Sequence, residues 1–160
     1  GYLRVNPTDA CTLPRVIRKE MHQLEEDQVS AFLKEVQGNP HEYLYKIALF
    51  TGLREGEILG LGWDHIDLEN GILTVKRQLR KEQKKGGQYY FSPPKNNRAR
   101  TISLAPSVVM LFRLQKLAQN SMRMEAGDAW QENGLVFSNQ TGGYLSYRTV
   151  YDCFKRIVKK

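Results

Sequence analysis

Residues 51–61, Thr-Gly-Leu-Arg-Glu-Gly-Glu-Ile-Leu-Gly-Leu, place an arginine between two apolar helical segments and constrain the fold more than any other stretch. The preceding run, residues 43–50, predicts a buried helix. Gly52 can end this helix because glycine tolerates the left-handed conformation of a C-terminal cap. The apolar residues that follow Arg54 predict a second helix, which runs out near Asp64. We therefore expect Arg54 in a tight turn between two packed helices.

An arginine with such rigid support suits a phosphate or a carboxylate, because the guanidinium offers a planar fork of donors. Glu57 follows Arg54 by three residues, so the two side chains share one helical face. Glu57 is therefore expected to orient the guanidinium. The alternative is an ordinary surface salt bridge at the start of a helix, and this stretch alone does not separate the two interpretations.

The composition is that of one globular domain, with 160 residues, 26% charged and 41% hydrophobic. No stretch approaches the roughly 20 apolar residues that span a bilayer, and the N-terminus does not resemble a signal peptide. We therefore expect no membrane partner. Cys11 and Cys153 are far apart and have no His or Cys at ligand spacing. This pattern predicts neither a metal site nor a disulfide, and the reducing cytoplasm is the default location.

The net charge of +7 is concentrated in one segment. Residues 76–100 contain nine basic residues and one acid, Glu82, so this segment carries +8 and the rest of the chain carries −1. A basic segment on a nearly neutral body is typical of a polyanion partner, with nucleic acid first. The alternative is a solvated basic loop.

Hydrophobic periodicity predicts an α+β fold that is mainly helical, with a small three-stranded antiparallel sheet. Asn70-Gly71 is a hairpin-type dipeptide before the first strand, and Ser146 is a candidate N-cap of the last helix. Residues 135–137 are expected to be briefly extended. The predicted helices are residues 24–36, 42–50, 108–124 and 147–160, and the predicted strands are residues 72–80, 88–91 and 100–104.

Four segments, in register along nearly the whole chain, resemble the tyrosine recombinases, the phage integrase family. Residues 51–61 resemble the first arginine box of the family, and residues 63–75 resemble its continuation into a sheet. Residues 94–104, Pro-Lys-Asn-Asn-Arg-Ala-Arg-Thr-Ile-Ser-Leu, resemble the hairpin that carries the catalytic lysine. Residues 136–146 resemble the segment that precedes the second box. The resemblance implies a site-specific DNA recombinase, or integrase, that breaks and rejoins strands through a 3′-phosphotyrosine intermediate.

The resemblance also implies a role for three residues. Arg54 would contact the scissile phosphate and stabilise its transition state, and Glu57 would support Arg54. Lys95 would protonate the departing 5′ oxygen; Lys81, Lys84 and Lys85 lie on a neighbouring loop, and Lys95 is preferred because it lies six residues before Thr101 on the short hairpin turn. The family needs no metal and no other cofactor.

Double-stranded DNA is the expected partner, through contacts chiefly to phosphates. Non-specific binding of this kind has dissociation constants of about 10⁻⁴ to 10⁻⁶ M and weakens with salt. The predicted DNA-binding residues are Lys76, Arg77, Lys84, Lys85, Arg98, Arg100 and Arg148.

The second box of the family, His-x-x-Arg followed by the nucleophilic tyrosine, is missing from this sequence. None of His22, His41 and His65 has an arginine three residues later. We therefore expect residues 1–20 to be a linker from a missing core-binding domain, and residues 21–160 to be a partial catalytic domain without a nucleophile. Such a fragment is predicted to be inactive alone, while its parent would act as a tetramer on DNA.

Two other functions compete with this interpretation. A non-catalytic DNA-binding remnant, which occupies sites or regulates an intact recombinase, fits the missing box but leaves Arg54, Glu57 and Lys95 unexplained. An RNA-binding module is weaker, because the chain has no RNP-like aromatic motif, although residues 89–91 could stack on bases.

Overall fold

The structure is a computed structural model that describes most of the chain after residue 24. The predicted linker, residues 1–20, lies outside the described residues except at three positions, and Lys85 of the predicted DNA-binding set also lies outside them. The described residues are Asn6, Thr8, Cys11, 25–84, 86–95 and 98–159.

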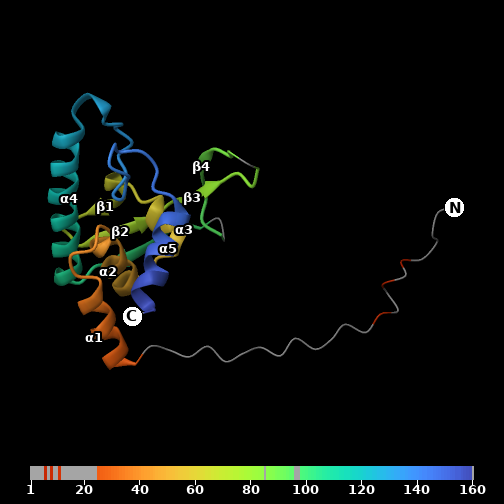
Figure 1. Cartoon of the computed structure of the whole chain (residues 1–160), viewed down its shortest axis with the longest axis horizontal. Helices are drawn as coiled ribbons and strands as arrows, with labels where there is room; N and C mark the ends of the chain where they lie inside the picture. The colour runs from red at the N-terminus through yellow and green to blue at the C-terminus, as the bar shows by residue number, and fades with distance from the viewer. Residues whose placement is uncertain are drawn as a thin grey trace.

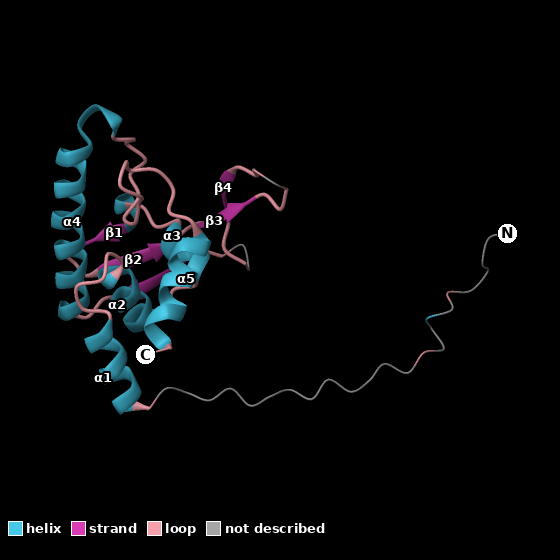
Figure 2. Cartoon of the chain, in the orientation of Figure 1, coloured by secondary structure: helices cyan, strands magenta, loops and turns pink. Residues whose placement is uncertain are grey.

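Helices dominate the described part of the chain (Figure 2). Their positions confirm the predicted helices to within two or three residues, except that the helix after Arg54 ends at Leu59 rather than near Asp64. Two short 3₁₀ helices, η2 (Trp63–His65) and η3 (Gly127–Ala129), follow α3 and α4. The α-helices are α1 (Glu26–Glu35), α2 (Glu42–Thr51), α3 (Glu55–Leu59), α4 (Pro106–Ala126) and α5 (Tyr147–Val158).

A three-stranded antiparallel sheet is present, but two of its strands differ from the prediction. Its order is β1 (Ile66–Asp67), β2 (Ile72–Val75) and β5 (Arg100–Ser103), with Leu73 opposite both Ile66 and Ile102. The predicted strand 72–80 is broken after Val75. Its second half, β3 (Gln78–Lys81), pairs with β4 (Tyr89–Ser92) as a separate hairpin. Figure 1 shows this hairpin projecting from the side of the molecule opposite α4.

The break between β2 and β3 has a physical cause in the contact between β3 and α3. Leu79 of β3 is fully buried. A methyl group on Gly60 would lie 2.6 Å from the backbone nitrogen of Leu79. A methyl group on Gly56 would lie 3.1 Å from the Leu79 carbonyl oxygen. These two glycines let α3 lie directly on the backbone of β3, so the chain leaves the sheet to pack there.

The core lies between the sheet and helices α2, α3 and α4. Ile47 of α2, Leu59 of α3, Leu73 of β2 and Phe112 of α4 are all fully buried. The predicted extended segment 135–137 is buried beside them. Two buried amides of α4 hold this segment, because Gln115 Nε2 donates to the Val136 carbonyl at 2.9 Å and Gln119 Nε2 to the Leu135 carbonyl at 2.8 Å.

Within the described ranges, no helix is long and apolar enough to cross a bilayer.

Candidate active site

Arg54 lies at the junction between α2 and α3, where the sequence predicts it. Gly52 ends α2 in the left-handed region at φ +64°, and Arg54 is the N-cap residue of α3. Glu57 holds Arg54 twice: its Oε2 accepts the Arg54 backbone N–H at 2.9 Å, and its Oε1 accepts Nη1 at 3.1 Å. The Arg54 side chain is still 61% exposed. The junction therefore fixes the base of the side chain and leaves most of the guanidinium in solvent.

Glu57 is the buried centre of the site, and its strongest partner is Arg100. The Glu57 side chain is 1% exposed. Arg100, the first residue of β5, donates from Nη1 to Oε1 and from Nη2 to Oε2, both at 2.7 Å. Two arginines from α3 and β5 thus share one carboxylate. The expected contact between Glu57 and Arg54 is present, whereas the pairing with Arg100 is not visible in the sequence.

The two arginines stabilise the charged form of Glu57. The hydrogen bonds from Arg100, and then those from the backbone and side chain of Arg54, lower the pKa of Glu57 to about 2, although burial opposes this shift. The same pairing raises the pKa of Arg100. The Glu57 carboxylate is therefore ionised at neutral pH and is paired with the Arg100 guanidinium.

Replacing Glu57 by glutamine should lower the free energy of unfolding by about 2–3 kcal/mol at pH 7, since both arginines lose a charged acceptor. The folded-state pKa of Glu57 lies below its ordinary value of 4.5, so the carboxylate stabilises the fold above about pH 4.5. This contribution is lost as the pH falls from about 4.5 through about 2.

Urea unfolding at pH 7, 5 and 3 measures this effect. The difference between wild type and Glu57→Gln should be largest at pH 7 and should shrink toward pH 3. The matched control is Glu55→Gln, an exposed neighbour on α3, which should change stability by less than about 0.5 kcal/mol. A pH-independent loss in Glu57→Gln would contradict the assigned ion pair.

Lys95 lies on the connection between β4 and β5, directly after Pro93 and Pro94. Its side chain is exposed, and within the described ranges no ion pair or hydrogen bond holds its ammonium. Lys95 precedes Arg100 by five positions, so its Cα is within about 18 Å of the Arg100 Cα. Lys95 thus precedes β5, whose first residue, Arg100, contacts Glu57.

The predicted DNA-binding residues fall into two groups. Lys76, Lys84, Arg98 and Arg148 are exposed; Lys84 pairs with Glu82 at 3.0 Å and Arg148 with Asp152 at 3.5 Å, both in solvent. Arg77 and Arg100 are engaged within the protein. Arg77 Nε donates to the Gly60 carbonyl at 2.9 Å, and its guanidinium lies over the Phe91 ring, 4.0 Å from the centroid.

An aromatic cluster fixes the β3–β4 hairpin against the start of α5. The rings of Tyr89 and Tyr144 lie 5.3 Å apart, and Phe91 meets Tyr144 edge-on at 5.8 Å. The Tyr147 hydroxyl donates to the Leu79 carbonyl, and burial raises the pKa of Tyr147 to about 12. A hydroxyl that is held in this way and hard to ionise is a poor nucleophile. The Tyr147 hydroxyl therefore ties the start of α5 to β3.

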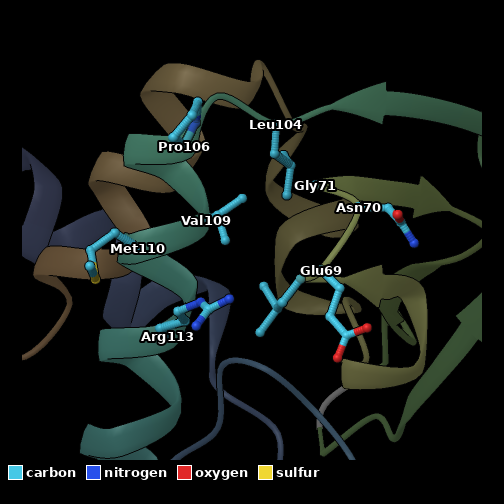
Figure 3. Close-up of a pocket in the computed structure, with 9 residues that line it drawn as sticks. Glu69, Asn70, Gly71, Leu104, Pro106, Val109, Met110 and Arg113 are labelled. Carbon is cyan, nitrogen blue, oxygen red and sulfur yellow. The ribbon is translucent and has the colours of Figure 1, made fainter.

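A pocket of about 420 Å³ lies on another part of the molecule, between α4 and the turn that joins β1 to β2 (Figure 3). Arg113 lines it from α4, and Glu69 and Asn70 line it from the turn. It contains neither Arg54 nor Lys95, so it is separate from the candidate active site.

Comparison with known proteins places this arrangement in a family of DNA-processing enzymes. The sequence model of the phage integrase family matches residues 22–160, so the chain belongs to this family. It is 26% identical to a tyrosine recombinase XerC-like protein of Caldanaerobacter subterraneus subsp. tengcongensis, covering 100% of the chain and 45% of that protein. It is 30% identical to an integrase of Streptomyces ambofaciens, covering 82% of the chain and 34% of that protein.

Solved structures agree with this assignment. The integrase of the transposon Tn1549, in complex with transposon right end DNA, matches with a TM-score of 0.71 at 25% identity over 95% of the chain. That match covers 52% of the integrase chain. XerA recombinase shares the fold, with a TM-score of 0.65 at 16% identity over 89% of this chain and 44% of its own. The chain thus spans about half the length of such relatives, or less.

Proposed function

We propose that this chain supplies the first half of the active site of a site-specific DNA recombinase that works through a 3′-phosphotyrosine intermediate. The observation that carries the proposal is the Arg54 guanidinium, which Glu57 holds at one nitrogen while the side chain stays 61% exposed. This geometry leaves most of the guanidinium donors free for the oxygens of a scissile phosphate.

Arg54 would stabilise the negative charge that develops on the phosphate in the transition state. Lys95 would act as the general acid, giving a proton to the departing 5′ oxygen. Glu57 would act only through Arg54, since the carboxylate is buried. The tyrosine that attacks the phosphate, and the second arginine, would come from a segment outside this sequence.

We propose further that residues 1–20 are a linker from a core-binding domain and that residues 21–160 alone are inactive. The support is the absence of His-x-x-Arg from the sequence. The same proposal gives double-stranded DNA as the partner, the cytoplasm as the location and a tetramer on DNA as the active assembly of the parent protein.

Duplex DNA binding by this chain tests the DNA-contact part of the proposal. We expect Lys76→Gln/Arg98→Gln to weaken binding about tenfold or more and to reduce the slope of log K against log salt concentration by about 1.8, or 0.9 for each lost phosphate contact. Fluorescence anisotropy of a labelled duplex at several salt concentrations measures both quantities.

The matched control is Lys34→Gln/Arg113→Gln, which removes two exposed charges on α1 and α4, away from the β3–β4 hairpin. Its affinity should stay within about twofold of wild type. Equal losses in the two double variants would mean that only the net charge matters, and the proposed DNA-binding surface would then be wrong.

A non-catalytic DNA-binding protein is the second candidate, and the missing His-x-x-Arg favours it. This candidate predicts the same salt-dependent binding but no role for Lys95. Covalent adduct formation by a full-length recombinase that carries this segment separates the two functions.

A further inference from the structure

We infer that Arg100 is a positioning residue that keeps the Arg54 guanidinium available for a DNA phosphate by occupying both oxygens of Glu57. The inference rests on the proposed function, because it concerns the same phosphate site. It gives Arg100 a task other than the direct phosphate contact expected from its place in the basic segment.

The first support is the hydrogen bonding of Glu57. A carboxylate offers about four acceptor positions. Oε1 accepts Arg100 Nη1 at 2.7 Å and Arg54 Nη1 at 3.1 Å, and Oε2 accepts Arg100 Nη2 at 2.7 Å and the Arg54 backbone N–H at 2.9 Å. All four positions are therefore filled, and the Arg54 side chain receives only one of them.

The second support is that the guanidinium groups of Arg100 and Arg54 contact Glu57 in different ways. Arg100 places both Nη atoms on Glu57 in the bidentate geometry that arginine and carboxylate prefer. Its side chain is 37% exposed, against 61% for Arg54. A guanidinium has five N–H donors, so four of those on Arg54 remain for another ligand. Arg54 is thus the free arginine of the pair, and Arg100 is the engaged one.

The consequence is a competition between the two arginines for one carboxylate. If the Arg100 fork were removed, the strongest arrangement left to Glu57 would be a bidentate pair with Arg54, three residues away. Arg54 would then turn two donors toward the protein interior and lose its contact with phosphate. A positive charge at position 100 is not enough to prevent this turn of Arg54. The two parallel hydrogen bonds from Arg100 are needed, because they occupy both oxygens of Glu57.

The Arg100→Lys variant separates geometry from charge. Lysine keeps the charge but cannot make the bidentate pair. In spectra of ¹⁵N-arginine-labelled wild type, rotation of the guanidinium about its Nε–Cζ bond should be hindered for Arg100 and free for Arg54. In Arg100→Lys it should become hindered for Arg54. A hindered Arg54 in wild type, or an Arg54 that stays free in the variant, would overturn the inference.

Binding to a labelled DNA duplex gives a second test of the inference. Arg100→Lys should reduce the slope of log K against log salt by about 0.9, as Arg54→Ala does, and the double variant Arg54→Ala/Arg100→Lys should show no further loss. Adding Glu57→Gln to Arg100→Lys should restore the slope, because the amide no longer attracts Arg54 as a carboxylate does. A wild-type slope in Arg100→Lys, or additive losses in the double variant, would show that Arg100 acts as a simple phosphate contact.

The two tests separate this inference from the proposed function. If the wild-type chain does not bind DNA, the proposed function fails, while the arginine spectra still decide whether Arg100 controls Arg54. Circular dichroism confirms that each variant folds. The arginine spectrum of the wild type, in which Arg100 should be hindered and Arg54 free, is a test that needs no variant.

Discussion

Arg54→Ala, in a full-length recombinase that carries this chain, should slow the formation of the covalent protein–DNA adduct by about 10³- to 10⁵-fold, the range for an arginine that stabilises a phosphoryl transition state. Glu57 already orients the guanidinium before DNA binds, because it accepts hydrogen bonds from the backbone N–H and the side chain of Arg54. A nicked duplex that traps the adduct, analysed on a denaturing gel over time, gives the rate.

The control for Arg54→Ala is Arg113→Ala, which removes one exposed arginine from α4 beside the remote pocket. Its adduct rate should stay within about threefold of wild type, since surface substitutions away from a site have small effects. Undiminished adduct formation in Arg54→Ala would refute the catalytic role assigned to this residue.

The second large effect is expected for Lys95→Ala, which should slow cleavage by about 10²- to 10⁴-fold through the loss of a general acid. The effect should depend on the leaving group. When sulfur replaces the bridging 5′ oxygen at the cleaved phosphate, the departing thiolate needs no proton, so Lys95→Ala should regain most of the wild-type rate. Arg54→Ala should not be rescued by this substrate.

The control for this experiment is Lys84→Ala, because Lys84 lies on the neighbouring loop and is paired with Glu82 in solvent. At saturating DNA concentrations, where a lost phosphate contact does not limit the rate, Lys84→Ala should cleave both substrates at nearly the wild-type rate. If the sulfur substrate rescues Lys84→Ala instead of Lys95→Ala, the general acid has been assigned to the wrong lysine.

Local patterns in the sequence were sufficient to predict the helices and the position of Arg54. Gly52 marks the end of α2 because its φ of +64° is one that glycine adopts without strain. The helix after Arg54 ends earlier than its apolar residues suggest. Gly60 caps it at the point where the chain lies on the backbone of β3, a contact between segments that are distant in sequence.

The strands could not be predicted fully from local patterns. Residues 72–80 alternate like one strand, and their periodicity does not reveal that the chain leaves the sheet after Val75. The reason is tertiary: Leu79 packs under α3, and the aromatic ring of Phe91 receives the Arg77 guanidinium. Packing of this kind overrides local strand propensity.

The partner of Glu57 was also beyond local reasoning. Its neighbour Arg54 is visible at a spacing of three residues, whereas Arg100 comes from a strand 43 positions later. Charge alone placed Arg100 with the DNA-binding residues, because a count of basic residues does not distinguish an engaged guanidinium from a free one. A buried carboxylate within a helix, Glu57, is the feature that calls for a second cation.

The most direct test of the central claim, that Arg54 is the phosphate-binding arginine of this chain, is its guanidinium resonance during titration with duplex DNA. We expect the Arg54 Nε–H signal to shift and to exchange more slowly with water as DNA is added, while the Arg113 signal stays unchanged. If the chain binds DNA and the Arg54 signal does not change, Arg54 does not contact phosphate and the proposed active site is wrong.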